Sequence, residues 1–242
     1  MRLTLGCIRR ADEQFGMIEK DDRIAVGVSG GKDSLLLLNA LALYRKFCKN
    51  PFELEAICLG LGYEPFDVSG VQALCDRLEV PFTYRKTDIK EVVFDIRKET
   101  NPCAMCAKLR RGALNNLAKE HGCNKVALGH HREDVVETFL MSLFFEGRLH
   151  LFAPVTYLSR VDVTVIRPMI YVPEKHIIQL ARKLELPIIH NPCPADGYTK
   201  RQEMKEMLNA ICRQIPTARQ YMLNALKNTA QYGLWDKCGQ DD

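Results

Sequence analysis

The sequence of 242 residues lacks any long apolar run. Its first residues, MRLTLGCIRRADEQ, do not contain the apolar core of a secretory signal. No stretch approaches the roughly 20 apolar residues that a membrane-spanning helix needs. We therefore expect a cytoplasmic protein with no membrane partner. A strong charge of one sign is also missing, since the net charge is only +4, which permits an anionic partner without requiring one.

Internal repeats and low-complexity segments are absent as well, and the length fits one large domain or a core domain with helical additions. Cysteine, by contrast, is abundant, with ten residues. Because cytoplasmic thiols stay reduced, we do not expect a disulfide framework. Some of the cysteines are therefore expected to bind metal or to carry chemistry.

Short β-branched runs alternate along the chain with segments of helical period. Strands are expected at 23–28, 54–59, 81–85, 126–128 and 163–166, and helices at 3–18, 35–47, 68–78, 88–98, 103–121 and 134–145. This alternation predicts an α/β fold with a doubly wound parallel sheet. The expected parts are an N-terminal helical segment (1–22), a core (23–190), and a C-terminal part with the loop around Cys193 and further helices (191–242).

A glycine-rich loop directly follows the first expected strand and precedes a helix. It consists of Ser29, Gly30, Gly31, Lys32, Asp33 and Ser34. Glycines let backbone N–H groups close on a phosphate, and the helix start adds partial positive charge. The hydroxyl groups of the two serines and the ammonium group of Lys32 add further donors. The loop predicts a site for the phosphates of a nucleotide.

Asp33 distinguishes this loop from two better-known nucleotide loops. The dinucleotide fingerprint needs three glycines at wider spacing, and the GxxxxGK[ST] loop has Ser or Thr where Asp33 stands. A carboxylate beside phosphates would repel them unless a cation lies between, so we expect Asp33 to help hold Mg²⁺. The simpler alternative is that Asp33 or Ser34 only caps the helix.

Three cysteines form a second candidate site. Cys103 and Cys106 stand at a helix start, and Cys193 lies between two prolines that no helix interior would tolerate. A redox pair needs no third cysteine, and a structural zinc needs a fourth ligand in a closed shell. A [4Fe–4S] cluster held by three cysteines would leave one iron open to an external ligand. Spacing alone leaves these alternatives open.

Several polar residues near these motifs have both a functional and a structural interpretation. Gly129, His130 and His131 follow a strand, and the imidazoles are candidates to contact phosphate or move a proton, or else to serve as core or capping groups. Asp134 is a candidate Mg²⁺ ligand or a helix cap. The basic residues are candidate RNA contacts or members of a solvated surface: Lys108, Arg110, Arg111, Arg167 and Arg201.

SGGKDS after a strand resembles the loop of the PP-loop ATPase superfamily, whose members cleave ATP between the α- and β-phosphates and adenylate a substrate. The segments CAMCAKLRRGAL (103–114), ALGHHR (127–132) and VIRP (165–168), with the Cys193 loop and Lys200-Arg201-Gln202, closely resemble the tRNA 2-thiocytidine synthetases. The matches follow the family's order from about residue 10 to 215. They depart from it at Glu133, where the family has Asp, and at Cys58-Leu-Gly-Leu-Gly62, which replaces a polar segment.

This resemblance implies an ATP-dependent enzyme that adenylates the 2-oxo group of a cytidine in the tRNA anticodon loop. Sulfur delivered through a [4Fe–4S] cluster then replaces that oxygen. The resemblance implies ATP, Mg²⁺ and the cluster as cofactors. It also implies a homodimer, and a sulfur donor such as a cysteine desulfurase or sulfide. The expected catalytic residues are Cys103, Cys106 and Cys193, which would ligate the cluster, with Lys32, Asp33 and Asp134.

Two alternatives remain from the residues themselves. The first is a PP-loop ligase or sulfurtransferase that acts on another base or small molecule, with the cysteines binding structural zinc. The second is a nucleotide-sensing or RNA-binding module without turnover. The cysteine pairs that flank the core in related 2-thiouridine thiolases are missing here, because Cys7 and Cys238 stand alone, and this disfavours that branch.

Overall fold

The computed structural model describes residues 1–97, 102–189, 193 and 200–228. The strands are β1 (Asp22–Val28), β2 (Phe52–Gly60), β3 (Phe82–Lys86), β4 (Lys125–Ala127), β5 (Val155–Leu158) and β6 (Val163–Ile166). The helices are α1 (Arg2–Phe15), α2 (Lys32–Tyr44), α3 (Ser69–Leu78), η1 (Glu91–Ile96, a π-helix), α4 (Pro102–Glu120), α5 (Arg132–Glu146), α6 (Glu174–Lys183), α7 (Lys200–Gln214) and α8 (Ala218–Lys227). None of them is long and apolar enough to cross a bilayer, within the described part of the chain.

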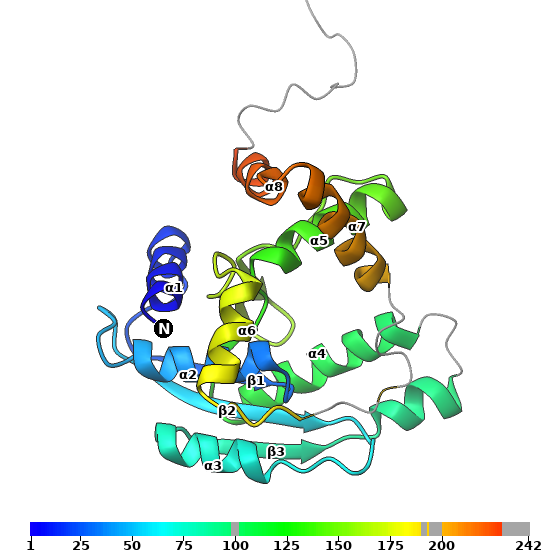
Figure 1. Ribbon diagram of the computed structural model, residues 1–242. Helices are drawn as coiled ribbons and strands as arrows, with labels where there is room; N and C mark the ends of the chain where they lie inside the picture. The colour runs from blue at the N-terminus through cyan, green and yellow to red at the C-terminus, as the bar shows by residue number, and fades with distance from the viewer. Residues whose placement is uncertain (98–101, 190–192, 194–199, 229–242) are drawn as a thin grey trace, which may run out of the picture. The chain divides into compact units, whose positions relative to one another are not determined.

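The six strands form one sheet in the order β3-β2-β1-β4-β6-β5 (Figure 1). All neighbouring pairs are parallel except β5 and β6. Strand order therefore reverses between β1 and β4, and in such sheets the crevice at the carboxyl ends of the strands is where ligands bind. The expected doubly wound parallel sheet is confirmed.

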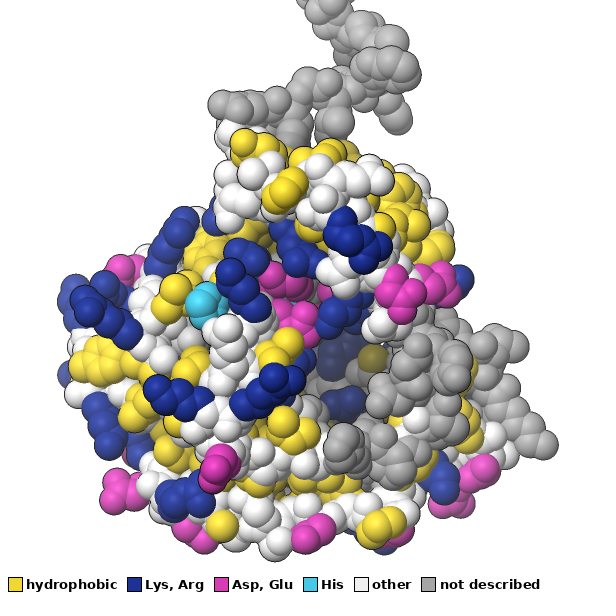
Figure 2. Space-filling view, in the orientation of Figure 1, with side chains coloured by type: hydrophobic (Ala, Val, Ile, Leu, Met, Phe, Trp, Pro, Cys, Tyr) yellow, Lys and Arg dark blue, Asp and Glu magenta, His cyan; other side chains and the backbone are white. Residues whose placement is uncertain are grey.

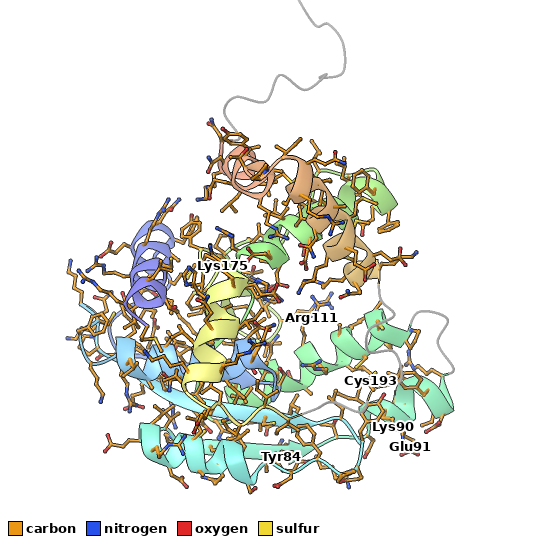
Figure 3. The ribbon with its side chains drawn as sticks, in the orientation of Figure 1. Tyr84, Lys90, Glu91, Arg111, Lys175 and Cys193 are labelled. Atoms are coloured by element: carbon orange, nitrogen blue, oxygen red, sulfur yellow. The ribbon has the colours of Figure 1, made fainter. Side chains whose placement is uncertain are left out.

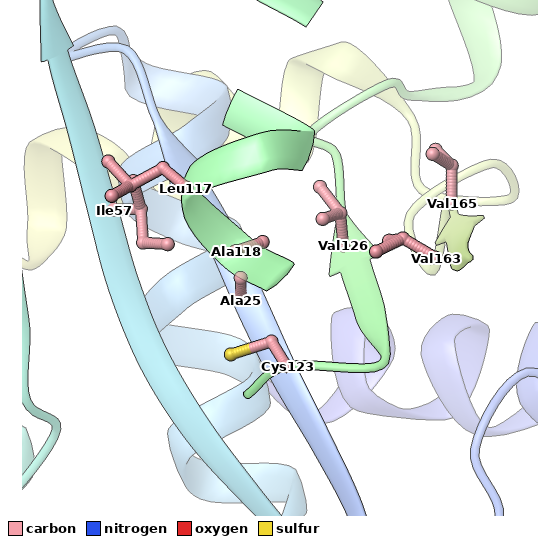
Figure 4. Close-up of a cluster of buried hydrophobic side chains, with 8 residues drawn as sticks. All are labelled: Ala25, Ile57, Leu117, Ala118, Cys123, Val126, Val163 and Val165. Atoms are coloured by element: carbon pink, nitrogen blue, oxygen red, sulfur yellow. The ribbon is translucent and has the colours of Figure 1, made fainter. Parts of the chain in front are cut away.

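One face of this sheet is covered by α4 (Figure 4). Leu117 and Ala118 of the helix are buried against Ala25, Ile57 and Val126 of three neighbouring strands. Ile24 and Val26 alternate with Ala25 along β1, so they point to the opposite face. There α2 packs against β1 and α6, and its residues 35–38 are all leucines with no exposed surface. The two-sided burial explains why β1 is nearly continuous in apolar residues.

The described structure separates into two compact units. The first comprises Met1–Asp134 and Phe152–Thr199 and carries the whole sheet; the second comprises Val135–Leu151 and Lys200–Asp242. In the second unit, Val136 and Leu140 of α5 pack against Met204 and Leu208 of α7. The boundaries expected at 22 and 190 stay a prediction, although most of α5 groups with the C-terminal helices. The α7 residues that pack on α5 lie 68 positions later in the chain (Val136 and Met204, Leu140 and Leu208), which no local pattern reveals.

Two further elements differ from expectation. The edge strand β5 was not predicted, because its four residues are too few and too exposed for a clear alternating pattern. The helical segment expected at 88–98 is a single π-helical stretch at Glu91–Ile96, with residue 98 outside the described part. The expected loop at 191–197 likewise lies outside the described residues, apart from Cys193.

Candidate active site: a phosphate loop beside three cysteines

The loop Ser29–Ser34 joins β1 to α2 and is braced by its own hydroxyl groups. The Ser34 hydroxyl accepts a hydrogen bond from the Ser29 N–H (3.1 Å) and donates one to the Gly31 carbonyl (3.0 Å). The Ser29 and Ser34 hydroxyl oxygens lie 3.2 Å apart. Gly30 has φ of +83°, a conformation that L side chains rarely adopt, so a glycine is needed there. The loop is therefore preformed at the start of α2, where a helix favours anions.

Lys32 lies between two carboxylates. Its ammonium nitrogen is 3.0 Å from Asp33 Oδ2 and 3.2 Å from Oε1 of Glu174, the first residue of α6. Burial lowers the pKa of Lys32, but the two carboxylates outweigh that effect and raise the pKa above its ordinary value. The side chain therefore carries a full positive charge at the phosphate loop.

The segment after β4 lies directly against this loop. A Cβ atom at Gly129 would lie 3.1 Å from the backbone carbon of Asp33 and from the backbone nitrogen of Ser34. These distances are shorter than most Cβ contacts, so the absence of a side chain at Gly129 lets the two loops approach closely. The segment after β4 and the phosphate loop therefore lie side by side.

His131 is buried among carboxylates contributed by three segments. Its ring nitrogens lie 3.8 Å from Asp33, 3.6 Å from Glu133, 3.5 Å from Asp134 and 4.0 Å from Glu174. Burial lowers the pKa of His131, but these carboxylates, Glu133 first, outweigh burial and raise it. The carboxylates therefore shift the imidazole toward its charged form, in which it would offset part of the acidic cluster.

Glu133, the departure from the family pattern, ties α5 to α6. Its carboxylate accepts the Glu174 N–H at 2.8 Å and pairs with the Arg132 guanidinium at 2.7 Å. Burial raises the pKa of Glu133, but His131, Arg132 and the Glu174 N–H outweigh it and lower the pKa to about 2. Glu133 thereby holds the start of α6 so that Glu174 faces Lys32.

Asp33 and Asp134 are the two expected magnesium ligands near the phosphate loop. Asp33 Oδ1 is buried without a hydrogen-bond partner among the described residues, which suits an oxygen that ligates a cation. Asp134 accepts the His131 N–H at 2.8 Å, so it caps the start of α5. In their present positions, no three Cys, His, Asp or Glu side chains of the described chain converge closely enough to enclose a single metal ion.

The third cysteine comes to the same region as the first two. The Tyr63 hydroxyl donates a hydrogen bond to Cys193 Sγ at 3.6 Å, and Cys103 and Cys106 both act electrostatically on Tyr63. Burial raises the pKa of Cys106, Arg110 lowers it, and Cys193 and Cys103 raise it further. Cys106 therefore lies within electrostatic reach of both other thiols. A cluster needs such a spread set, since each cysteine binds its own iron.

The cysteine region is linked directly to the phosphate loop. Ile189, four residues before Cys193, donates its N–H to the Gly30 carbonyl at 2.9 Å. A Cβ at Gly30 would lie 2.9 Å from Ile189 Cβ, so the two segments are in close contact. Figure 3 shows Cys193 beyond the carboxyl ends of β2 and β3, in the same region as Lys90.

The remaining candidates differ in their surroundings. Lys108 and Arg111 are exposed on α4, three residues apart, and the Arg111 Nε donates to the Ala107 carbonyl at 3.2 Å. Arg110 is only partly exposed and acts on Cys106. Arg167 is buried: it donates to the Ala153 carbonyl at 2.6 Å, and burial lowers its pKa to about 10.

Arg201 of α7 donates to the Thr138 hydroxyl at 3.2 Å within the second unit. The His130 ring packs on Phe152 with centroids 4.8 Å apart. On the face drawn in Figure 2, basic and acidic side chains are interspersed, as the dispersed sequence charges suggested. Their assignment as RNA or phosphate contacts stays a prediction.

Sequence reasoning missed two residues of this region, Tyr63 and Glu174. Glu174 follows Pro173 at a helix start, a pattern that marks the helix but not its partner Lys32, which is 142 positions earlier. Tyr63 directly follows Gly62, at the end of the segment that departs from the family pattern. The departure of this segment from the family pattern is the sequence feature that could have pointed to Tyr63.

Comparison with known proteins gives the chain its family. A model of the PP-loop domain matches residues 5–211. The tRNA-cytidine(32) 2-sulfurtransferase of Citrifermentans bemidjiense is 38% identical over 235 residues, covering 95% of this chain and 91% of that protein. The protein of the same name from Geotalea daltonii is 39% identical over 233 residues, covering 95% and 92%.

Among solved structures, the U34-tRNA thiolase NcsA from Methanococcus maripaludis with its [4Fe-4S] cluster superposes with a TM-score of 0.74 at 25% identity, covering 96% of this chain and 80% of that one. The fold expected from the resemblance is thereby confirmed. The chain belongs to the PP-loop family and, within it, to the family of the tRNA-cytidine(32) 2-sulfurtransferases.

Proposed function

We propose that this protein is an ATP-dependent tRNA sulfurtransferase that replaces the 2-oxo group of cytidine 32 in the anticodon loop with sulfur. Membership of the family supports this function over a ligase that acts on another substrate. The observation that carries it is the hydrogen bond from Ile189 to Gly30. It joins the segment that leads to Cys193 to the loop that would hold the phosphates of ATP.

Activation of the base is the first step. The cytidine O2 attacks the α-phosphorus of ATP, the bond to the bridging oxygen breaks, and pyrophosphate leaves into the Ser29–Ser34 loop. Backbone N–H groups of the loop and the ammonium of Lys32 face the charge that develops on the leaving group. The result is a 2-O-adenylate, in which AMP is a good leaving group.

Lys32 must exchange partners when ATP binds. Without nucleotide its ammonium is shared by Asp33 and Glu174, and phosphate oxygens would compete with Glu174 for it. Mg²⁺ would supply Lewis-acid charge beside the phosphates, held by Asp33 with Asp134 as the second candidate ligand. His131 would offset the remaining carboxylates when its imidazole is charged, a form that these carboxylates favour.

Replacement of the adenylate is the second step. A sulfide equivalent bonds to C2 of the base, the bond from C2 to oxygen breaks, and AMP departs with that oxygen. Cys103, Cys106 and Cys193 fit as ligands of a [4Fe–4S] cluster, because all three thiols act on Tyr63 and two of them act on Cys106. When bound, such a cluster supplies an open iron position for an external sulfur ligand.

The base must leave its stack to reach both sites, which costs least in a single-stranded loop. Lys108 and Arg111 on the exposed side of α4 are suited to bind the phosphates of that loop, since α4 begins at the Cys103–Cys106 pair. Arg167 is suited less well, because its guanidinium is held by the β5 region. The cytoplasmic location, the sulfur donor and the homodimer stay predictions.

The function is tested in cells. We would delete the gene, digest total tRNA and quantify its modified nucleosides by mass spectrometry. Loss of 2-thiocytidine, with thiouridines unchanged and with recovery on re-expression, is the expected result. Unchanged 2-thiocytidine would refute the proposed substrate.

A further inference from the structure

The Tyr63 side chain forms a hydrogen bond with a candidate cluster ligand, Cys193. Its hydroxyl donates to Cys193 Sγ at 3.6 Å, within the range for a sulfur acceptor, and only 9% of the residue is exposed. Neither the phosphate chemistry nor RNA binding uses this phenol. Its placement against sulfur therefore needs a separate explanation.

The chain builds this placement with several local contacts. Gly62 has φ of +90°, a backbone conformation in which glycine is strongly favoured, and this turn directly precedes Tyr63. The Lys90 N–H donates to the Leu61 carbonyl at 2.9 Å, which fixes the turn against the start of η1. The Lys90 ammonium also lies 5.4 Å from the centroid of the Tyr63 ring. Contacts thus fix the backbone next to Tyr63 and one face of its ring.

Hydrogen bonds to ligand sulfurs are one of the main means by which proteins tune iron–sulfur centres. A donor at the sulfur stabilises the additional negative charge of the reduced cluster, so it raises the reduction potential. It also orients the thiolate, and such outer contacts typically affect metal affinity about 10- to 100-fold. A buried phenol is suited to this role because it donates without carrying charge.

We propose that Tyr63 is a positioning residue for the metal centre: its hydroxyl bonds the Cys193 sulfur, orients this third ligand, and raises the reduction potential of the cluster. The inference rests on the proposed function, because it needs Cys193 to be a ligand. It adds a residue from the β2–α3 connection to a site otherwise built from the α4 start and the Cys193 loop.

The test compares Tyr63→Phe with a matched control, Tyr171→Phe. Tyr171 is similarly buried (8% exposed), and its hydroxyl donates to Gln14 at 2.8 Å, not to sulfur. Each full-length protein is reconstituted with iron and sulfide without oxygen. The midpoint potential is then measured by electron paramagnetic resonance during a dithionite titration, and iron retention is measured against a chelator.

We expect Tyr63→Phe to have a lower midpoint potential than the wild-type protein and to lose iron about tenfold more readily. Tyr171→Phe should match the wild-type protein in both measurements. An unchanged potential in Tyr63→Phe overturns the inference, even if the thermal unfolding midpoint of the metal-free variant falls, because that result describes a purely structural residue. A wild-type protein that takes up no cluster overturns the proposed function and this inference together.

Discussion

Glu133 provides a quantitative test of how the site is held together. On folding, the pKa of this buried carboxyl falls from 4.5 to about 2, because His131, Arg132 and the Glu174 N–H outweigh the effect of burial. At about 1.4 kcal/mol for each pKa unit, this linkage is worth about 3 kcal/mol. Glu133→Gln keeps an oxygen that can accept the Glu174 N–H but removes the charge. We therefore expect the variant to lose about 3 kcal/mol of unfolding free energy at pH 7.

The pH dependence follows from the direction of the shift. A carboxyl whose pKa is lower in the folded state contributes its full stabilisation above the unfolded value of 4.5 and loses it as the pH falls toward 2. Urea denaturation followed by circular dichroism at pH 7, 5.5 and 4 measures the difference between Glu133→Gln and the wild-type protein. The difference should be smaller at pH 4 than at pH 5.5.

The control is Glu53→Gln. The Glu53 side chain is 78% exposed, and its carboxylate lies 3.9 Å from the Arg23 guanidinium, a long distance for an ion pair. An exposed ion pair of this kind contributes little to stability, so the unfolding free energy of this variant should be almost that of the wild-type protein. Equal unfolding free energies for Glu133→Gln and the wild-type protein at pH 7 would refute the reasoning. So would a difference in unfolding free energy that grows as the pH falls from 5.5 to 4.

Two further predictions concern the phosphate loop and the exposed basic residues. Gly129→Ala should raise the KM for ATP in a pyrophosphate-release assay and cost about 1–3 kcal/mol of stability, because its new Cβ would press on the backbone of the phosphate loop. Gly112→Ala, where a Cβ meets nothing within 4 Å, should do neither, and an unchanged KM in Gly129→Ala would contradict the loop contact. Replacing Lys108 and Arg111 together by Ala should weaken tRNA binding and reduce the slope of log K against log salt by about 2. The control is Lys119→Ala, near the other end of α4. An unchanged salt slope in the double variant would exclude Lys108 and Arg111 as phosphate contacts.

Local sequence patterns were sufficient to predict much of the fold. The order of strands and helices follows from apolar periodicity, and the phosphate loop from glycines between a buried strand and a helix. Cys58, Cys75 and Cys123 stand in apolar sequence patterns and are buried, whereas Cys212, in a similar pattern, is only partly buried. Burial raises the pKa of Cys58 to about 12, which keeps its thiol protonated.

Local patterns could not predict contacts between residues that lie far apart in the chain. Glu174 reaches Lys32 only because α6 packs on α2, and Tyr63 reaches Cys193 across 130 positions of the chain. Burial in the folded protein also raises the pKa of the Cys106 thiol, an effect that the local sequence does not contain.

The proposed function requires Cys193 to complete a sulfur-transfer centre beside the phosphate loop. The most direct measurement is the yield of 2-thiocytidine in tRNA incubated without oxygen with ATP, Mg²⁺, sulfide and reconstituted protein, for Cys193→Ala against Cys212→Ala. Cys212 packs among apolar residues of the second unit and serves as the matched control. We predict wild-type yield from Cys212→Ala and none from Cys193→Ala. Full thiolation by Cys193→Ala protein that holds no iron would contradict the account.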